Sequence, residues 1–202
     1  MKRTKYIFLF LMSVLFINIQ ASDKAEIDKK APDFKLTDTK GKEHSLSDFK
    51  GKYVVLEWNN FDCPFVKKHY DSKNMQSLQK KYTGKDVVWL TINSSASGKQ
   101  GNYSSADLNK KILNYEGSMT AYLVDESGKV GQMYGAKTTP HMYVINPEGT
   151  LVYAGGIDDT PSTDVDDVPK SKNYVAAALE ASMAGEKIEV KTSKPYGCSV
   201  KY

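Results

Sequence analysis

The stretch YVVLEWNNFDCPFVKKHY, residues 53–70, decides the fold that this sequence predicts. Residues 53–58 are mostly apolar, with branched and aromatic side chains, which is typical of a buried strand. A short loop then delivers Cys63, and Pro64 opens a helix, because the first helical position leaves its N–H without a partner and proline has none. We therefore expect Cys63 at or beside the helix N-cap, where the helix dipole and the free N–H groups favour a thiolate.

A cysteine at the start of a helix is a candidate nucleophile. The same residue could instead pack as a small apolar side chain, or form one half of an inert structural disulfide. The reactive interpretation holds only if the helix begins where the sequence predicts, because the thiolate is favoured by that geometry.

Residues 1–21 have the composition of a secretory signal peptide. Three basic residues precede residues 6–19, an almost wholly apolar run of 14 residues. This run is shorter than the roughly 20 residues that a membrane-spanning helix needs. We predict cleavage after Ala21, a periplasmic or secreted product, and no stable membrane span after cleavage. An uncleaved anchor helix is the alternative.

The charge of the mature chain argues against nucleic acid as a partner. The leader holds three of the 28 basic residues and none of the 24 acidic ones, so 25 basic residues remain against 24 acidic ones. No cluster of lysines with interleaved aromatic residues accompanies this near-neutral balance. We interpret residues 22–30 as a linker, 31–185 as one domain with its own core, and 186–202 as a C-terminal tail that carries Cys198.

Metal binding is not predicted. The two cysteines and three histidines lack the paired spacing of zinc ligands. Five aspartates lie within residues 157–168, but they lack the alternating ligands and central glycine of a calcium loop, so we expect a solvated loop there.

Strand and helix patterns alternate along the rest of the chain. Strands are expected at 31–38, 53–58, 86–93, 120–125, 142–145 and 151–154, and helices at 64–82, 105–115, 130–134 and 171–184, with Asn74 as a candidate break in the first. This alternation predicts an α/β fold with a sheet covered on both faces.

Taken together, these pieces resemble the redoxin group of the thioredoxin-like superfamily, the alkyl hydroperoxide reductase/thiol-specific antioxidant proteins. The resemblance rests on APDFKL at 31–36, SLSDFKGK at 45–52, the strand that leads to Cys63, Thr139-Pro140 and the NPEG turn at 146–149. It implies a thioredoxin-like fold with a central mixed sheet, helices on both faces and an extra N-terminal β-hairpin. It also implies a cis-proline loop at Pro140 that faces Cys63 across a shallow cleft.

The resemblance also implies the members of a site. Cys63 and Cys198 would be the two catalytic thiols, unless their bond is a permanent staple of the tail. Glu57 falls where thioredoxins keep a buried carboxylate that shuttles a proton; alternatively, it is hydrated near the strand end. The substrate would meet four residues, namely Pro64, Thr139, Pro140 and His141. His69 is expected at the surface.

Two departures from the family pattern limit the chemistry. There is no Cys-x-x-Cys, because Asn60 and Val66 stand three residues before and after Cys63. The proline and threonine of the peroxiredoxin motif are replaced by Leu56 and Asn60, and the only arginine of the chain is Arg3, inside the leader. Lysine does not supply the planar fork of arginine, so standard peroxide reduction is disfavoured.

The prediction is therefore an exported thioredoxin-fold thiol oxidoreductase that uses Cys63 as nucleophile and Cys198 as second thiol. Its reaction would be thiol–disulfide exchange with protein or small-molecule thiols, or an antioxidant reduction of peroxides. No cofactor is expected, and a partner reductase would supply electrons. The alternative is a non-catalytic binding module whose Cys63–Cys198 disulfide is structural.

Overall fold

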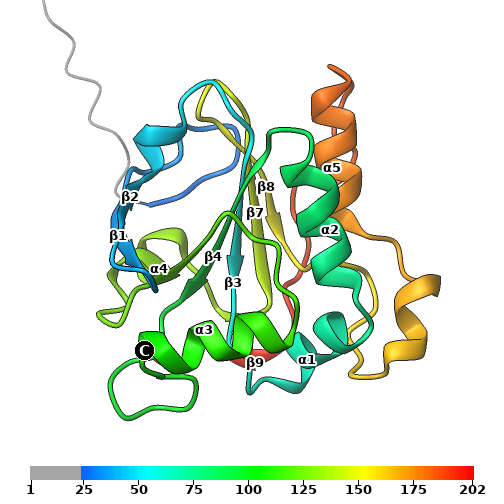
Figure 1. Ribbon diagram of the computed structural model, residues 1–202. Helices are drawn as coiled ribbons and strands as arrows, with labels where there is room; N and C mark the ends of the chain where they lie inside the picture. Colours follow the sequence, from blue (N-terminus) through cyan, green and yellow to red (C-terminus); the bar gives the residue numbers. More distant parts are fainter. Residues whose placement is uncertain (1–23) are drawn as a thin grey trace, which may run out of the picture.

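Residues 24–202 are described by a computed structural model, in which a seven-stranded sheet forms the centre (Figure 1). The predicted signal peptide lies outside these residues. The strand order is β2-β1-β5-β4-β3-β7-β8. The strands are β1 (Lys35–Asp38), β2 (Glu43–Ser45), β3 (Val54–Trp58), β4 (Val88–Asn93), β5 (Ala121–Val124), β7 (His141–Ile145) and β8 (Leu151–Gly155). Two short strands, β6 (Thr138–Thr139) and β9 (Cys198–Ser199), pair separately.

The sheet is mixed. Strands β3, β4 and β5 run parallel, whereas β7, β8 and β1 join it in antiparallel pairs. Strands β1 and β2 form an N-terminal hairpin at one edge. The predicted thioredoxin-like α/β fold with an extra hairpin is confirmed.

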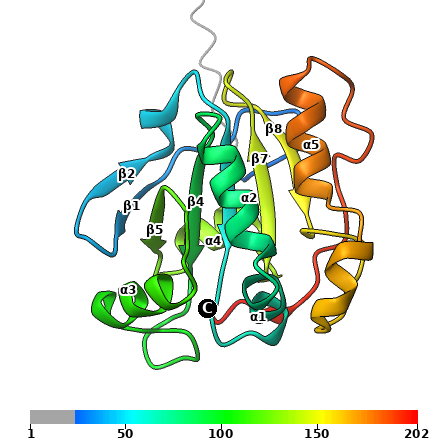
Figure 2. The ribbon, with the colours of Figure 1, turned by 45° about the vertical axis from the view of Figure 1, so that its right-hand side comes forward.

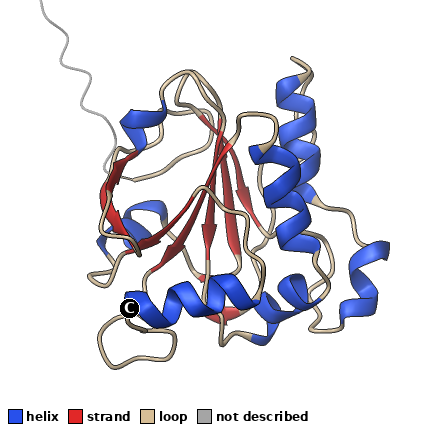
Figure 3. Cartoon of the chain, in the orientation of Figure 1, coloured by secondary structure: helices blue, strands red, loops and turns tan. Residues whose placement is uncertain are grey.

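Helices cover both faces of the sheet (Figure 3). They are α1 (Pro64–Asp71), α2 (Asn74–Thr83), α3 (Ser105–Asn114), α4 (Lys129–Tyr134) and α5 (Tyr174–Met183), with 3-10 turns η1 (Leu46–Phe49) and η2 (Val165–Lys170). One core lies under α1, α2, α3 and α5, and the other under α4 and η1. Strand β3 is buried on both faces, with Val55 in the first core and Val54 in the second, which explains its continuous apolar run.

The helical run predicted over 64–82 is interrupted next to Asn74, the candidate break, and forms two helices. Lys73 adopts a φ of +61°, a left-handed conformation that an α-helix cannot continue through. Helix α1 therefore ends at Asp71, and α2 begins at Asn74 in a new direction. None of the helices within residues 24–202 is both long and apolar enough to cross a bilayer.

The antiparallel pairing of β3 and β7 brings two loops together. Trp58, at the end of β3, lies opposite His141, at the start of β7. The loop that follows β3 carries Cys63, and the residue that precedes β7 is Pro140. These loops therefore meet at one end of the sheet, where β9 also lies, beside α1 in both views (Figures 1 and 2).

Candidate active site

Cys63 is the N-cap residue of α1. Its φ of −72° and ψ of 124° are extended, and Pro64 occupies the first turn. The carbonyl oxygen of Cys63 accepts the first helical hydrogen bonds, from the N–H groups of Val66 at 3.0 Å and Lys67 at 2.9 Å. The side chain makes no capping bond, so the sulfur is left to contact the neighbouring loop.

The sulfur of Cys63 lies between the proline loop and the C-terminal tail. Its Sγ donates to the carbonyl oxygen of Thr139 at 3.0 Å, and the backbone N–H of Cys198 donates to Sγ at 3.4 Å. The Thr139–Pro140 peptide bond is cis. Cys63 is completely buried.

The tail reaches this position by forming a strand pair with the proline loop. Strand β9 runs antiparallel to β6, so that Cys198 lies opposite Thr139 and Ser199 lies opposite Thr138. Gly197 has a φ of +128°, and a Cβ at this position would collide with the carbonyl oxygen of Thr139. The expected shallow cleft is therefore wrong for this structure, because the tail fills the space in front of Cys63.

Cys198 is half-buried, and both cysteines are free thiols in this structure. Burial, together with the hydrogen bond and charge of Cys63, raises the pKa of the Cys198 thiol to about 11, above that of an ordinary cysteine. Cys198 therefore remains protonated near neutral pH while the tail is in place.

Glu57 is fully buried beneath α1 and α2, so the hydrated alternative is wrong. Its carboxylate accepts five hydrogen bonds, from Asn59 Nδ2 (3.0 Å), the Tyr70 hydroxyl (2.9 Å), Gln79 Nε2 (3.1 Å), Trp89 Nε1 (2.8 Å) and the Thr91 hydroxyl (3.1 Å). Burial raises the pKa of Glu57 above its usual range, and the hydrogen bonds from its donors offset only part of this rise.

Glu57 reaches the cysteine helix through Tyr70. The Tyr70 hydroxyl bonds the carboxylate from the second turn of α1, and its ring packs edge-on against Phe61 at 5.2 Å in the cysteine loop. No hydrogen bond joins Glu57 to Cys63 among the residues described. The Glu57 carboxylate therefore anchors the second turn of α1 through Tyr70 and does not contact the Cys63 thiol.

The other predicted site residues lie around the same loop. Pro64 is exposed at the start of α1, and Pro140 is buried behind Cys63. His141 is also buried, and its Nδ1 accepts from the N–H of Lys137 at 3.3 Å. Burial and the nearby Lys137 charge lower the pKa of His141 to about 3, so its ring is neutral at pH 7.

Residues 27–154 match the AhpC/TSA family. The chain belongs to this family. Among curated proteins none matches the chain.

Several solved structures share the architecture of this AhpC/TSA chain. An uncharacterized conserved protein from Geobacillus kaustophilus is 28% identical with a TM-score of 0.74, and the match covers 88% of this chain and 92% of that one. A hypothetical protein from Sinorhizobium meliloti has 24% identity and a TM-score of 0.75, with coverage of 89% and 96%. The pneumococcal exposed lipoprotein thioredoxin from Streptococcus pneumoniae is 29% identical with a TM-score of 0.50, with coverage of 69% and 96%.

Two residues that the sequence placed in solvent are buried in this AhpC/TSA chain. His69 is completely inaccessible, and Asp158, in the loop expected to be solvated, is 3% exposed. Both contact Tyr196, which sequence reasoning missed as a site residue. Its position two residues before Cys198 was the one available signal.

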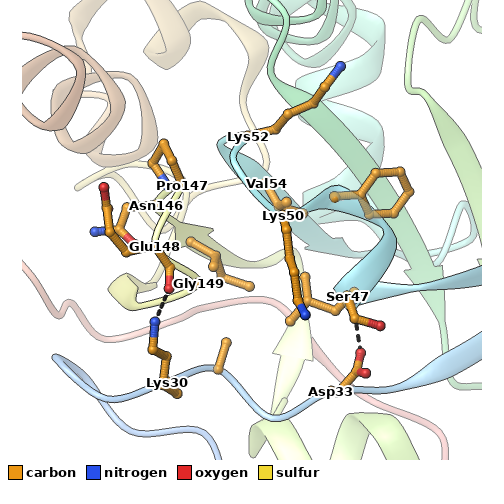
Figure 4. A pocket seen from close by; sticks show the side chains of 14 residues that line it. Lys30, Asp33, Ser47, Lys50, Lys52, Val54, Asn146, Pro147, Glu148 and Gly149 are labelled. Atoms are coloured by element: carbon orange, nitrogen blue, oxygen red, sulfur yellow. Dashed lines mark hydrogen bonds between the residues drawn. The ribbon is translucent and has the colours of Figure 1, made fainter.

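A cavity of about 470 Å³ lies at the opposite end of β3 from Cys63 (Figure 4). Three of its charged side chains have partners, of which Lys30 bonds the Glu148 carbonyl oxygen and Asp33 accepts from the N–H of Ser47 at 3.0 Å. Lys52 pairs with Asp86 at 2.7 Å. The cavity contains no thiol, and it is separate from the candidate active site.

Proposed function

We propose that this AhpC/TSA protein is an exported thiol oxidoreductase that exchanges disulfides through Cys63 and Cys198. The observation that carries the proposal is the contact of the Cys198 backbone N–H with the Cys63 sulfur at 3.4 Å. A thiol at the start of a helix and a second thiol on the strand pair beside it can form a redox couple. The pneumococcal neighbour, which is called a thioredoxin, supports the same class of reaction.

The reaction has two exchange steps. The Cys63 thiolate attacks one sulfur of a substrate disulfide, and the other sulfur leaves as a thiolate and takes up a proton. The Cys198 thiolate then attacks the Cys63 sulfur of the mixed disulfide and expels the second substrate thiol. The substrate gains two electrons, and the protein ends with a Cys63–Cys198 disulfide that a partner reductase reduces. The reverse sequence oxidises a dithiol, and the two reduction potentials decide the direction.

The order of attack follows from the two environments. Cys63 lies at the N-terminus of α1, where the helix dipole stabilises negative charge. Cys198 has a pKa raised to about 11, so little of it is thiolate at pH 7 while the tail is docked. Cys63 is therefore assigned the first attack, and Thr139 and Pro140 border the incoming sulfur.

Peroxide reduction is the less favoured antioxidant activity. The partners of the Cys63 sulfur in the described chain are the carbonyl oxygen of Thr139 and the N–H of Cys198, not a cation. Of the two candidate lysines in α1, Lys67 is exposed, and Lys68 directs its Nζ to the carbonyl oxygen of Thr160 at 3.0 Å. A peroxide would therefore lack the positive group that normally holds its oxygens.

The test uses the mature chain with a peptide disulfide as substrate and limiting dithiol as reductant. Wild type should turn over, Cys63→Ser should lose all exchange, and Cys198→Ser should accumulate a mixed disulfide on Cys63 that mass spectrometry identifies. Unchanged turnover in Cys63→Ser would overturn the proposal. A Cys63–Cys198 bond that resists millimolar reductant until the protein unfolds would support the alternative, a binding module with a structural disulfide.

A further inference from the structure

A buried polar cluster lies next to the tail and outside the thiol pair. It joins three distant segments: His69 of α1, Asp158 after β8 and Tyr196 of the tail. His69 Nε2 lies 3.1 Å from the Tyr196 hydroxyl, and that hydroxyl donates to Asp158 Oδ1. His69 Nε2 is also 3.9 Å from Asp158 Oδ2. Neither step of the exchange reaction uses these groups.

The hydrogen bonds of the cluster have one consistent direction. The Asn74 amide nitrogen lies 2.9 Å from His69 Nδ1, so Nδ1 accepts and the ring proton sits on Nε2. Nε2 then donates to the Tyr196 oxygen, which in turn donates to Asp158. Burial and the neighbouring Lys68 charge lower the pKa of His69 to about 3, which keeps the ring neutral. His69 Nε2 therefore has an acceptor within hydrogen-bond distance only while Tyr196 is in place, whereas Asp158 Oδ1 also accepts from the N–H of Thr160 at 3.0 Å.

The ring of Tyr196, like its hydroxyl, contacts residues of α1. It packs edge-on against Phe65 of α1, with ring centroids 5.8 Å apart, and Lys68 Nζ lies 5.9 Å from the ring centroid. Withdrawal of the tail would remove these contacts. It would also leave His69 Nε2 without the acceptor that it has in the closed protein.

Only Gly197 separates Tyr196 from Cys198, the second thiol, along the chain. Gly197 passes close to the carbonyl oxygen of Thr139, and Cys198 then pairs with Thr139 and contacts Cys63. The conformation of Gly197 leaves no room for a side chain, so the tail lies against the proline loop between Tyr196 and Cys198.

We propose that Tyr196, held by His69 and Asp158, is a positioning residue that keeps Cys198 at Cys63 and the tail closed over it. This inference rests on the proposed function only for the exchange step; the covering of Cys63 is a property of the reduced protein. When the tail opens, Cys63 is exposed to substrate disulfides. When the tail closes again, it brings Cys198 to the mixed disulfide on Cys63.

The decisive variant is Tyr196→Phe, which keeps the ring and removes the hydroxyl. Loss of a hydrogen bond to a charged acceptor predicts an opening equilibrium about ten- to a hundredfold larger. In a Cys198→Ser background, alkylation of Cys63 by iodoacetamide should accelerate by that factor under native conditions. This readout needs no catalytic turnover.

The same variant with both cysteines present tests the exchange step. Dithiobisnitrobenzoate releases one arylthiolate when Cys63 attacks it and a second when Cys198 closes the disulfide. Tyr196→Phe should speed the first release and slow the second. Gly197→Ala should change both rates in the same directions, because its Cβ prevents the tail from docking.

Tyr174→Phe is the matched control. Tyr174 and Tyr196 both line a cavity of about 380 Å³ beside the tail. Within residues 24–202, the Tyr174 hydroxyl makes no hydrogen bond to the tail, unlike that of Tyr196, which bonds His69 and Asp158. The two release rates of Tyr174→Phe should equal those of wild type. Unchanged rates in Tyr196→Phe would overturn the inference, whether or not Gly197→Ala alters them. Failure of the proposed function would appear separately, as an unchanged first release in Cys63→Ser.

Discussion

The backbone nitrogen of Cys198 lies 3.4 Å from the sulfur of Cys63, although 135 positions separate the two residues. The contact depends on Thr139, which pairs with Cys198 along the strand and accepts from the Cys63 thiol at 3.0 Å. The nucleophile, the second thiol and the cis-proline loop thus form one hydrogen-bonded unit. The reduced protein presents this unit closed.

The first prediction concerns the ionisation of Cys198. Its pKa is raised to about 11 by burial and by Cys63, so the rate of its alkylation in reduced wild type should rise with pH to a midpoint near 11. Peptide mass spectrometry after iodoacetamide treatment measures this rate. Replacement of Cys63 by Ala should lower the midpoint, because it removes the second cause of the shift. A wild-type midpoint near that of a free cysteine would contradict the prediction.

The second prediction concerns Glu57. Glu57→Gln places an amide N–H₂ among five donors, so at least one buried donor loses its acceptor. We expect the free energy of unfolding to fall by about 2–5 kcal/mol, measured by urea denaturation. The control is Glu43→Gln, in which an exposed pair with Lys35 at 3.5 Å is lost and the change should stay below about 1 kcal/mol. Equal effects in the two variants would mean that the carboxylate is not needed by its donors.

Local signals in the sequence explain why the cysteine helix was predicted. An apolar run predicts β3, and proline at the first helical position predicts the start of α1 at Pro64. The predicted order of strands and helices along the chain was sufficient to predict the α/β fold. The candidate break at Asn74 lies next to the observed one, but the left-handed residue is Lys73, because a lysine carries no turn signal of its own.

Long-range contacts explain what the sequence could not predict. His69 is buried because the tail and the loop at Asp158 close over α1, and neither is near it in the chain. A histidine on a lysine-rich helix resembles a surface residue when only its own helix is considered. The same contacts turn the expected open cleft into a covered sulfur.

The third prediction uses Thr139, whose hydroxyl is buried and without a hydrogen-bond partner among the described residues. Thr139→Val exchanges this hydroxyl for a methyl group and keeps the carbonyl that contacts Cys63. The free energy of unfolding should rise by about 1 kcal/mol. Thr138→Val is the control, because the Thr138 hydroxyl donates to the Pro140 carbonyl at 3.2 Å and its loss should destabilise. Loss of stability in Thr139→Val would show that the hydroxyl has a partner in solution.

The fourth prediction concerns acid stability. His69 and His141 have pKa values lowered to about 3 by burial, against 6.5 in an unfolded chain. Between these values the unfolded state binds the proton and the folded state does not, so their contribution to stability is complete above pH 6.5 and is lost as the pH falls towards 3. Each histidine should contribute about 1.4 kcal/mol per pH unit to the slope between pH 6 and 5.

Substitution isolates that slope from all other titrating groups. His69→Gln should reduce the pH dependence of the unfolding free energy by about one proton, and His69→Gln with His141→Gln by about two. Urea denaturation at about pH 7.0, 6.0, 5.5 and 5.0, which covers the upper part of the window between the unfolded and folded pKa values, measures the difference from wild type. An identical slope in wild type and the double variant would mean that both rings accept protons in the folded protein. The buried neutral state of His69, on which its bond to Tyr196 depends, would then be wrong.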